Sequence, residues 1–279
     1  MILSKKPFLG IMQGRLSISK NSQIQSFPNT SWMTEFSAAA ECGFDTIEWI
    51  FDELSNPIFN EKQKISSVSK ENNVKINSLC ADYFMIHKLF NEPNNEIEKN
   101  TKILSNLIDV CHESEIKIIE IPLVDSSSLK KKSHEQEILK NLESMKEKLE
   151  KYSMIINLET DLPPIQFKKL LDEINSPYIK ANYDTGNSAS LGYDCKEELD
   201  VLLPYISNIH LKDRIFNGNT VPLGNGSVNF DLFFSILSKT NYSGDLIIQG
   251  ARENELKIAP YETCKKYHNF VKDYIDKLF

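Results

Sequence analysis

Short apolar runs recur along the chain and are separated by longer stretches in which charged and apolar residues are mixed. The runs are rich in Ile, Val, Phe and Tyr and have the length of β-strands. Eight such runs begin at Pro7, Phe44, Lys75, Ile116, Ser153, Ile179, Ile206 and Gly244. Successive runs start about 25 to 40 residues apart, the length of a strand and a returning helix. The pattern therefore predicts repeated β–α units.

The stretches between the runs have helical periodicity. Trp32, Phe36 and Ala39 fall on one helical face, and Gly43 follows as a C-cap glycine. Pro163 and Pro164 suit the first turn of a later helix. Helices are expected over residues 32–42, 96–111, 134–151, 163–174, 230–237 and 261–278.

Eight strand–helix alternations in 279 residues favour a closed (β/α)8 barrel. The rival fold is an open, doubly wound sheet. It is less favoured because neither GxGxxG nor GxxxxGK[ST] follows the first strand. No linker or low-complexity tract interrupts the chain, so residues 1–279 are expected to form a single barrel domain.

Composition excludes several function classes. With 32 basic and 39 acidic residues the formal net charge is −7, which disfavours general binding to nucleic acid. No apolar run approaches the roughly 20 residues of a membrane helix, and no export signal is visible, so a cytoplasmic location is expected. The five cysteines form no CxxC pair and are interpreted as buried thiols, with Cys80 the best candidate for a nucleophile. A homo-oligomer is compatible with the sequence.

Polar residues cluster where the eight runs end, and barrel enzymes build their sites at the carboxyl ends of strands. Buried carboxylates are costly unless they are compensated, and a divalent ion is a common compensator. One ion, Mn²⁺, Mg²⁺, Co²⁺ or Zn²⁺, is expected at Glu159, Asp184, His210 and Gln249. The alternative is a set of satisfied polar residues or buried ion pairs.

The fragments IEWI, NLET, NYDTGN, NIHLKDR, VPLGNG and IIQGAR occur in this order along the chain. In this respect the sequence resembles the xylose-isomerase-like TIM barrel family of sugar phosphate isomerases and epimerases. The resemblance implies metal ligation by a Glu, an Asp, a His and usually a second Glu on strands five to eight. Carried over by motif, these positions are Glu159, Asp184, His210 and Gln249.

Gln249 departs from the family pattern, because an amide can bind a metal but cannot exchange protons as the second glutamate does. Three interpretations remain open. Glu159 can work with Lys212, Glu120 or a metal-bound water; the reaction can be an aldose–ketose isomerisation that needs one base; or the site can have lost its usual chemistry. Asn187 stands where the family often has a histidine, which argues against a second metal there.

The sequence offers further candidates for binding the substrate, a small sugar or sugar phosphate. Arg214, Arg252 and the glycine-rich residues 224–226 could hold a phosphate, although both arginines could instead pair with neighbouring acids. Lys212 is a possible catalytic base if burial lowers its pKa, or a partner of another site residue. The expected substrate-binding residues are Gln13, Arg15, Glu48, His87, Asn187, Arg214 and Arg252, with Glu48 alternatively contacting the ligand histidine.

We therefore expect a metal-dependent isomerase or epimerase of a sugar or sugar phosphate. Glu159 would transfer the proton and the ion would stabilise an enediolate. A barrel that binds sugars but has lost catalysis is the alternative, motivated by Gln249. An endonuclease-like metal phosphodiesterase ranks lower, because only one of the five histidines falls at a predicted strand end.

Overall fold

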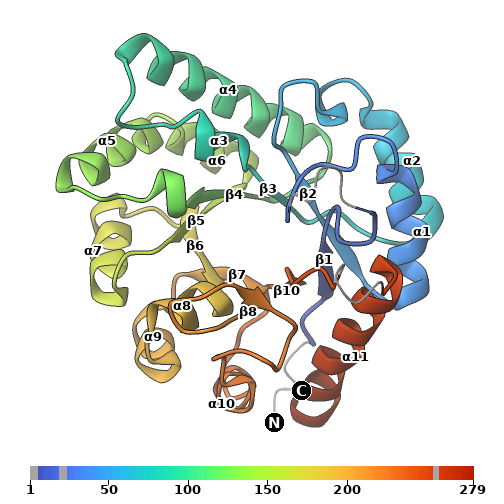
Figure 1. Ribbon diagram of the computed structural model, residues 1–279. Helices are drawn as coiled ribbons and strands as arrows, with labels where there is room; N and C mark the ends of the chain where they lie inside the picture. The colour runs from blue at the N-terminus through green and yellow to red at the C-terminus, as the bar shows by residue number, and fades with distance from the viewer. Residues whose placement is uncertain (1–5, 19–23, 254–257) are drawn as a thin grey trace.

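A ring of parallel strands surrounded by helices forms the body of the protein (Figure 1). The computed structural model describes residues 6–18, 24–253 and 258–279. Within them, eight strands close a barrel in the order β1-β10-β7-β6-β5-β4-β3-β2, and all neighbouring pairs are parallel. Their bounds are β1 Leu9–Met12, β2 Thr46–Ile50, β3 Ser78–Cys80, β4 Ile118–Leu123, β5 Ile155–Thr160, β6 Ile179–Asp184, β7 Ile206–Leu211 and β10 Asp245–Ile248. The predicted (β/α)8 fold is confirmed, and each strand lies inside one of the predicted runs.

The described helices pack around the outside of the ring. They are α1 Trp32–Cys42, α2 Lys62–Asn72, α3 Tyr83–Ile86, α4 Asn94–Glu113, α5 Lys132–Glu143, α6 Lys146–Tyr152, α7 Pro164–Ile174, α8 Thr185–Leu191, α9 Cys195–Leu202, α10 Phe230–Leu237 and α11 Pro260–Leu278, with the 3₁₀ turns η2 Pro57–Phe59 and η3 Asp125–Ser127. No helix in this part of the chain is long and apolar enough to cross a membrane.

Local sequence signals account for most helix ends. Gly43 ends α1 with a left-handed φ of 96°, and its N–H donates to the carbonyl oxygens of Ala39 and Ala40. The helix predicted over residues 134–151 is in fact two helices, α5 and α6. The break lies at Ser144, whose hydroxyl donates to the carbonyl oxygen of Asn141 and so competes with the helical hydrogen bonds. Helix α2 was not predicted because Ile65 is its only buried residue.

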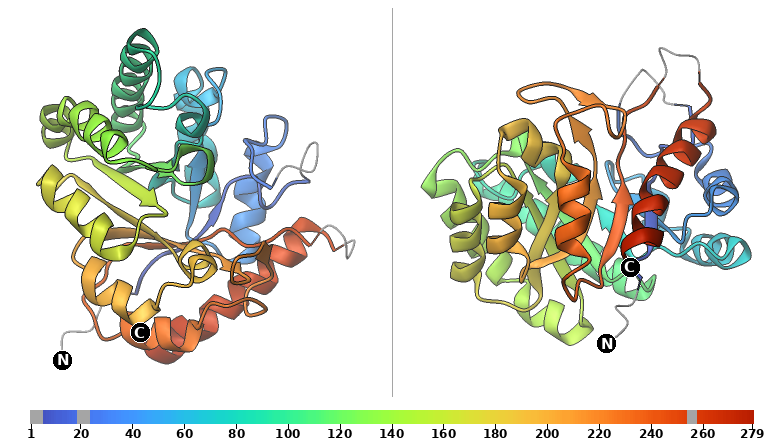
Figure 2. Two further views of the ribbon diagram at one scale, coloured as in Figure 1. Left: turned by 60° about the vertical axis from the view of Figure 1, so that its left-hand side comes forward. Right: turned by 90° about the horizontal axis from the view of Figure 1, so that it is seen from below.

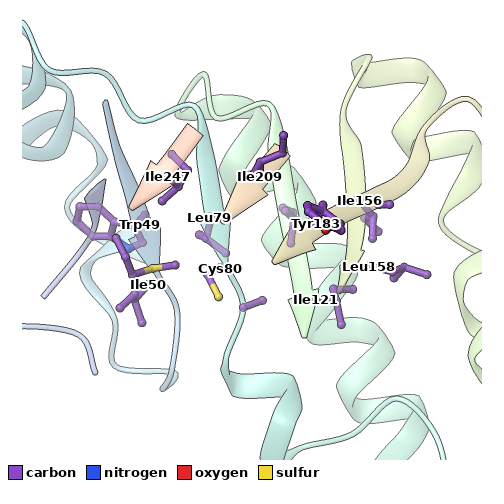
Figure 3. Packing of buried hydrophobic residues seen from close by; sticks show 14 of the residues in the cluster. Trp49, Ile50, Leu79, Cys80, Ile121, Ile156, Leu158, Tyr183, Ile209 and Ile247 are labelled. Atoms are coloured by element: carbon purple, nitrogen blue, oxygen red, sulfur yellow. The ribbon is translucent and has the colours of Figure 1, made fainter. Parts of the chain in front are cut away.

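Polar and apolar residues alternate along the strands, and the polar set faces the barrel interior. Glu48 on β2 contacts Asn208 and His210 on β7, although these strands are not neighbours in the ring. The alternate residues point outward to the helices, as Trp49 does against Trp32 of α1 at 5.5 Å between ring centroids. Figure 3 shows this apolar layer, which includes Trp49, Leu79, Ile121, Ile156, Leu158, Tyr183 and Ile209. The hydrophobic core therefore lies between the strands and the helices, and the barrel centre is left to polar side chains.

A two-stranded hairpin, formed by β8 Asp213–Arg214 and β9 Thr220–Val221, follows β7. In the right-hand view of Figure 2 it stands beyond the end toward which the strand arrows point. The hairpin therefore borders the carboxyl end of the barrel, where barrel enzymes carry their sites.

A buried amide fixes the exit of β2. Asn56 is fully buried, donates to the carbonyl oxygen of Ile50 at 2.9 Å, and accepts from Trp49 Nε1 at 2.9 Å and Ile58 N at 3.1 Å.

Asn56→Leu keeps the volume but leaves these groups unpaired, so we expect a loss of roughly 3 kcal/mol in the free energy of unfolding. Urea denaturation measures it. The exposed Asn95→Leu is the control, and an equal loss in both variants would contradict this assignment.

Candidate active site

The carboxyl ends of the strands open into a cavity of about 880 Å³. Several residues predicted for the site line it, namely Arg15, Glu159, Asn187, Lys212, Arg214 and Gln249. Gln13, Glu48, Asp184 and His210 are buried near these residues and do not line the cavity. His87 lies apart from them: it is exposed, and its ring stacks on Tyr83 with the centroids 4.2 Å apart.

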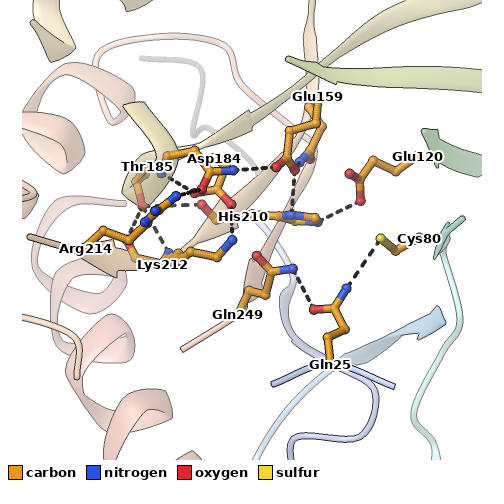
Figure 4. Close-up of polar contacts among 12 residues, drawn as sticks. Gln25, Cys80, Glu120, Glu159, Asp184, Thr185, His210, Lys212, Arg214 and Gln249 are labelled. Carbon is orange, nitrogen blue, oxygen red and sulfur yellow. Dashed lines mark hydrogen bonds and ion pairs between the residues drawn. The ribbon is translucent and has the colours of Figure 1, made fainter. Parts of the chain in front are cut away.

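His210 on β7 lies at the centre of the buried carboxylates (Figure 4). Its Nε2 lies 2.6 Å from Glu48 Oε2 and 3.3 Å from Glu120 Oε2, and its Nδ1 lies 3.1 Å from Glu159 Oε2. Burial opposes protonation of His210, but the charges of Glu48 and Glu120 outweigh it and raise its pKa well above the ordinary value. Glu48 thus contacts the histidine, one of the two roles that the sequence suggests for it.

The pKa values of two carboxyl groups around this imidazole are shifted in opposite directions. Burial is the main cause that raises the pKa of Glu120 well above its ordinary range. Burial would also raise the pKa of Glu159, but the contact with His210 and the charge of Lys212 lower it to about 2. The Glu159 side chain, which lines the cavity, therefore favours its ionised form.

The first three residues of the DTGN fragment, Asp184, Thr185 and Gly186, lie against Lys212, and the fourth, Asn187, reaches Glu159. Asp184 Oδ1 accepts from Asn187 N at 2.8 Å, which caps helix α8, and its Oδ2 lies 2.8 Å from Lys212 Nζ. A Cβ on Gly186 would fall 2.8 Å from Lys212 Cγ, so only glycine lets the two segments approach. Asn187 Nδ2 donates to Glu159 Oε1 at 2.7 Å. Burial opposes the charge on Lys212, yet Asp184 and Glu159 raise its pKa, the opposite of the shift that a base would need.

The glycine-rich loop that could have bound a phosphate is occupied by a side chain of this protein. The Asp213 carboxylate accepts from Gly224 N at 2.9 Å, Gly226 N at 2.8 Å and Val228 N at 3.1 Å. A Cβ at position 226 would fall 2.2 Å from Asp213 Oδ1. The loop therefore serves to fix the hairpin that follows β7.

The two arginines considered for phosphate bind oxygen atoms of the protein itself. Arg214 donates to Asn187 Oδ1 at 2.9 Å and to the carbonyl oxygen of Gly218 at 3.0 Å. Arg252 donates to the carbonyl oxygens of Gly14, Ser17 and Ile24. Arg214 still lines the cavity, whereas Arg252 braces the chain that follows β1.

Sequence reasoning missed Gln25 and gave Asp82 no role. Gln25 Oε1 accepts from Gln249 Nε2 at 2.8 Å, and Gln25 Nε2 donates to Asp82 Oδ2 at 2.7 Å. Cys80 Sγ donates to Asp82 Oδ1 at 3.2 Å, and burial raises the pKa of this thiol well above its usual range, which argues against a nucleophile. Gln25 follows β1 outside any helix or strand, so no periodic signal marks it.

The residues predicted as ligands fit a divalent ion. Glu159, Asp184 and His210 each offer one ligand atom, and these atoms lie within 4.8 Å of one another. Gln249 Oε1 is buried and has no hydrogen-bond partner among the described residues, although the amide nitrogen has one. Two carboxylates, an imidazole and an amide oxygen suit Mn²⁺, Mg²⁺, Co²⁺ or Zn²⁺.

A second group, Glu48, Glu120 and His210, also brings ligand atoms within 4.8 Å of one another. We favour the group with Asp184 because Glu48 engages His210 Nε2 at 2.6 Å and leaves Nδ1 for an ion. A carboxylate on the far nitrogen is the usual support of a ligating histidine.

Comparison with known proteins identifies the family. A family model described as xylose isomerase-like TIM barrel matches residues 36–263, so the chain belongs to this family, as the sequence motifs predict. The chain is 27% identical over 246 residues to "Putative L-ribulose-5-phosphate 3-epimerase SgbU" of Haemophilus influenzae, over 79% of this chain and 84% of that protein.

A second relative agrees with this assignment, and a solved structure agrees with the barrel fold. L-ribulose-5-phosphate 3-epimerase UlaE of Salmonella heidelberg is 23% identical over 265 residues, which span 89% of this chain and 88% of that protein. A solved structure described as the IOLI protein with a binding zinc atom superposes with a TM-score of 0.77 at 16% identity, covering 98% of this chain and 99% of that one. The names of the two relatives are those of isomerase-class enzymes, the class that the sequence predicts.

The segment after β1 depends on a buried acid, Glu35, which accepts from Gly14 N at 2.7 Å. Burial raises its pKa from 4.5 to about 7, so the native state holds this proton more tightly than the unfolded chain does. Stability contributed by this proton is present below pH 4.5 and is lost as the pH rises to 7.

The Glu35→Gln variant has no such titration. Its free energy of unfolding, relative to that of the wild type, should therefore rise by roughly 2 kcal/mol between pH 5 and pH 8.

Urea titrations at the two pH values measure this difference. Glu41→Gln, on the exposed face of the same helix, is the matched control. A Glu35→Gln difference that stays constant with pH would show that Glu35 does not titrate in this range.

Proposed function

We propose that the protein is a metal-dependent isomerase or epimerase of a sugar or sugar phosphate. The observation that carries this proposal is the arrangement of Glu159, Asp184, His210 and Gln249. They stand at or just after the carboxyl ends of β5, β6, β7 and β10, which are consecutive in the ring, and Glu159 and Gln249 also line the cavity. The names of the relatives support the same reaction class.

Glu159 is the proton-transfer residue in this proposal. Its carboxylate is held from both sides, by Asn187 Nδ2 at 2.7 Å on Oε1 and by Asn182 Nδ2 at 2.8 Å on Oε2. A carboxylate held in one orientation can remove a proton from the carbon beside a carbonyl and return it to the resulting enediolate. A divalent ion bound at the site would supply Lewis-acid stabilisation of the negative oxygen.

Lys212 contributes charge in this proposal. Its ammonium group lines the cavity and is fixed by Asp184 Oδ2 at 2.8 Å. A fixed cation next to the cavity stabilises negative charge that develops on a substrate oxygen. Asn187 and Arg214, which are joined at 2.9 Å, present further donors at the wall and are proposed to bind sugar hydroxyl groups.

Gln249 restricts the chemistry, because its amide binds an ion through oxygen but does not shuttle protons at neutral pH. Aldose–ketose isomerisation needs only one shuttling base and is therefore compatible with Glu159 alone. Epimerisation needs a second proton donor on the opposite face of the enediolate. Glu120, which lines the cavity, is the carboxyl available for that role among the residues considered from the sequence.

Solvent isotope exchange tests the proposal directly. Protein purified without chelator should contain a divalent ion and incorporate deuterium from D₂O into a ketopentose, a ketohexose or their phosphates. Glu159→Gln should lower the exchange rate by a factor of at least 1,000, because the amide cannot accept the proton. Mass spectrometry of the recovered sugars measures the exchange and shows which carbon reacts.

Two controls make this experiment decisive. Removing the ion with a chelator should stop exchange and adding it back should restore it, whereas Glu98→Gln on the exposed surface of α4 should leave the rate unchanged. Absence of both ion and exchange across the panel would refute the enzyme and leave a barrel that binds sugars.

That second candidate, a sugar-binding barrel without catalysis, is favoured by one observation, the amide at position 249. Gln249→Glu separates the two functions. If the wild type is an enzyme, it turns over a ketose and the substitution does not raise its rate. Epimerase activity created by Gln249→Glu on a sugar that the wild type binds but does not turn over would establish the binding function. NMR of the sugar products follows both reactions.

A further inference from the structure

Gln25 lies between the candidate metal site and the opposite wall of the cavity. It follows β1, and its amide contacts polar groups from different parts of the chain, two of which, Gln249 and Cys80, are seen in Figure 4. Gln25 Oε1 lies 3.2 Å from Arg15 Nη2 and 2.8 Å from Gln249 Nε2, while Gln25 Nε2 lies 2.7 Å from Asp82 Oδ2. Every hydrogen-bonding atom of this amide is therefore in use.

The chemistry of its neighbours fixes which way the Gln25 amide points. Arginine has donors and no acceptor, so the atom facing Arg15 must be the amide oxygen. A carboxylate has acceptors and no donor, so the atom facing Asp82 must be the amide nitrogen. The reversed amide would place an N–H group against Arg15 and an oxygen against Asp82, losing two hydrogen bonds at once.

This orientation in turn fixes Gln249. Because Gln25 presents an oxygen to it, Gln249 can respond only with its amide nitrogen. The other end of the amide, Oε1, is then turned away from Gln25. It is buried and accepts no hydrogen bond within the described residues. In Figure 4 it is directed toward the side of the site where Asp184 and Lys212 lie.

We propose that Gln25, anchored by Arg15 and Asp82, is a positioning residue that presents the amide oxygen of Gln249 to the bound divalent ion. The proposal rests on the metal site described under the proposed function and adds a residue to it. It also explains why an amide suits position 249. A glutamate there would place a carboxylate oxygen against the Gln25 oxygen. Both atoms are acceptors, so no hydrogen bond could form between them.

A double-mutant cycle on ion affinity tests the proposal without relying on catalysis. Mn²⁺ is titrated calorimetrically into ion-stripped wild type, Gln25→Met, Gln249→Leu and the double variant. Methionine keeps the length of the glutamine side chain but cannot orient an amide. We expect Gln25→Met to weaken Mn²⁺ binding about tenfold, the scale for residues that support a ligand, and Gln249→Leu to weaken it at least as much. The double variant should bind no more weakly than Gln249→Leu, because Gln25 acts through Gln249 alone.

The outcomes separate the possible failures. Losses that add in the double variant, or a Gln25→Met affinity equal to wild type, overturn the positioning role while leaving the metal site intact. Wild type that does not bind Mn²⁺ overturns the metal site itself, and this proposal with it.

A second variant keeps the proposal testable if Gln25→Met does not fold. Asp82→Ala removes the acceptor that holds Gln25 Nε2, so the amide is held at its oxygen end only. We expect it to weaken Mn²⁺ binding in the wild type more than in the Gln249→Leu background. An equal effect in both backgrounds would mean that Asp82 acts only through its charge, and would overturn the proposed chain of contacts.

Discussion

The imidazole of His210 is the element on which the interior of this barrel depends. Three glutamates point into the same buried space, and isolated carboxylates there would cost several kcal/mol each. His210 lies within 3.3 Å of all of them, at distances of 2.6 Å to Glu48, 3.3 Å to Glu120 and 3.1 Å to Glu159. The polar centre is possible only because the apolar core has been placed elsewhere, between the strands and the helices.

The DTGN, IHLKDR and PLGNG fragments of the sequence form one interlocked unit. In DTGN, Asp184 caps a helix and binds Lys212, while Asn187 reaches Glu159. The segment after β7 supplies Lys212 together with Asp213, whose carboxylate occupies the backbone donors of the PLGNG loop. Each fragment therefore satisfies polar groups that another one buries, as a buried polar network requires.

Donor and acceptor chemistry also sets direction within the site. Arginine at one end and aspartate at the other orient the amide of Gln25, which then determines the orientation of Gln249. The proposed site would offer two carboxylates, one imidazole and one neutral oxygen to an ion. A neutral fourth ligand makes the site less negative than a second glutamate would. It also leaves the cavity with one proton acceptor fewer, so the residue that binds the metal also limits which reaction is possible.

The sequence alone determined the eight strands, because apolar runs and helical stretches recur at a length that only parallel β–α units accommodate. It also indicated Glu159, Asp184 and His210, since polar residues at successive strand ends meet at one rim of a closed barrel. Only the tertiary structure decided the roles of Gln25, Asp213 and Arg252. Gln25 contacts Gln249, 224 positions away, and Arg252 binds a carbonyl oxygen 238 positions away. Such contacts depend on loop paths and hydrogen-bond geometry, which leave no periodic trace in the chain.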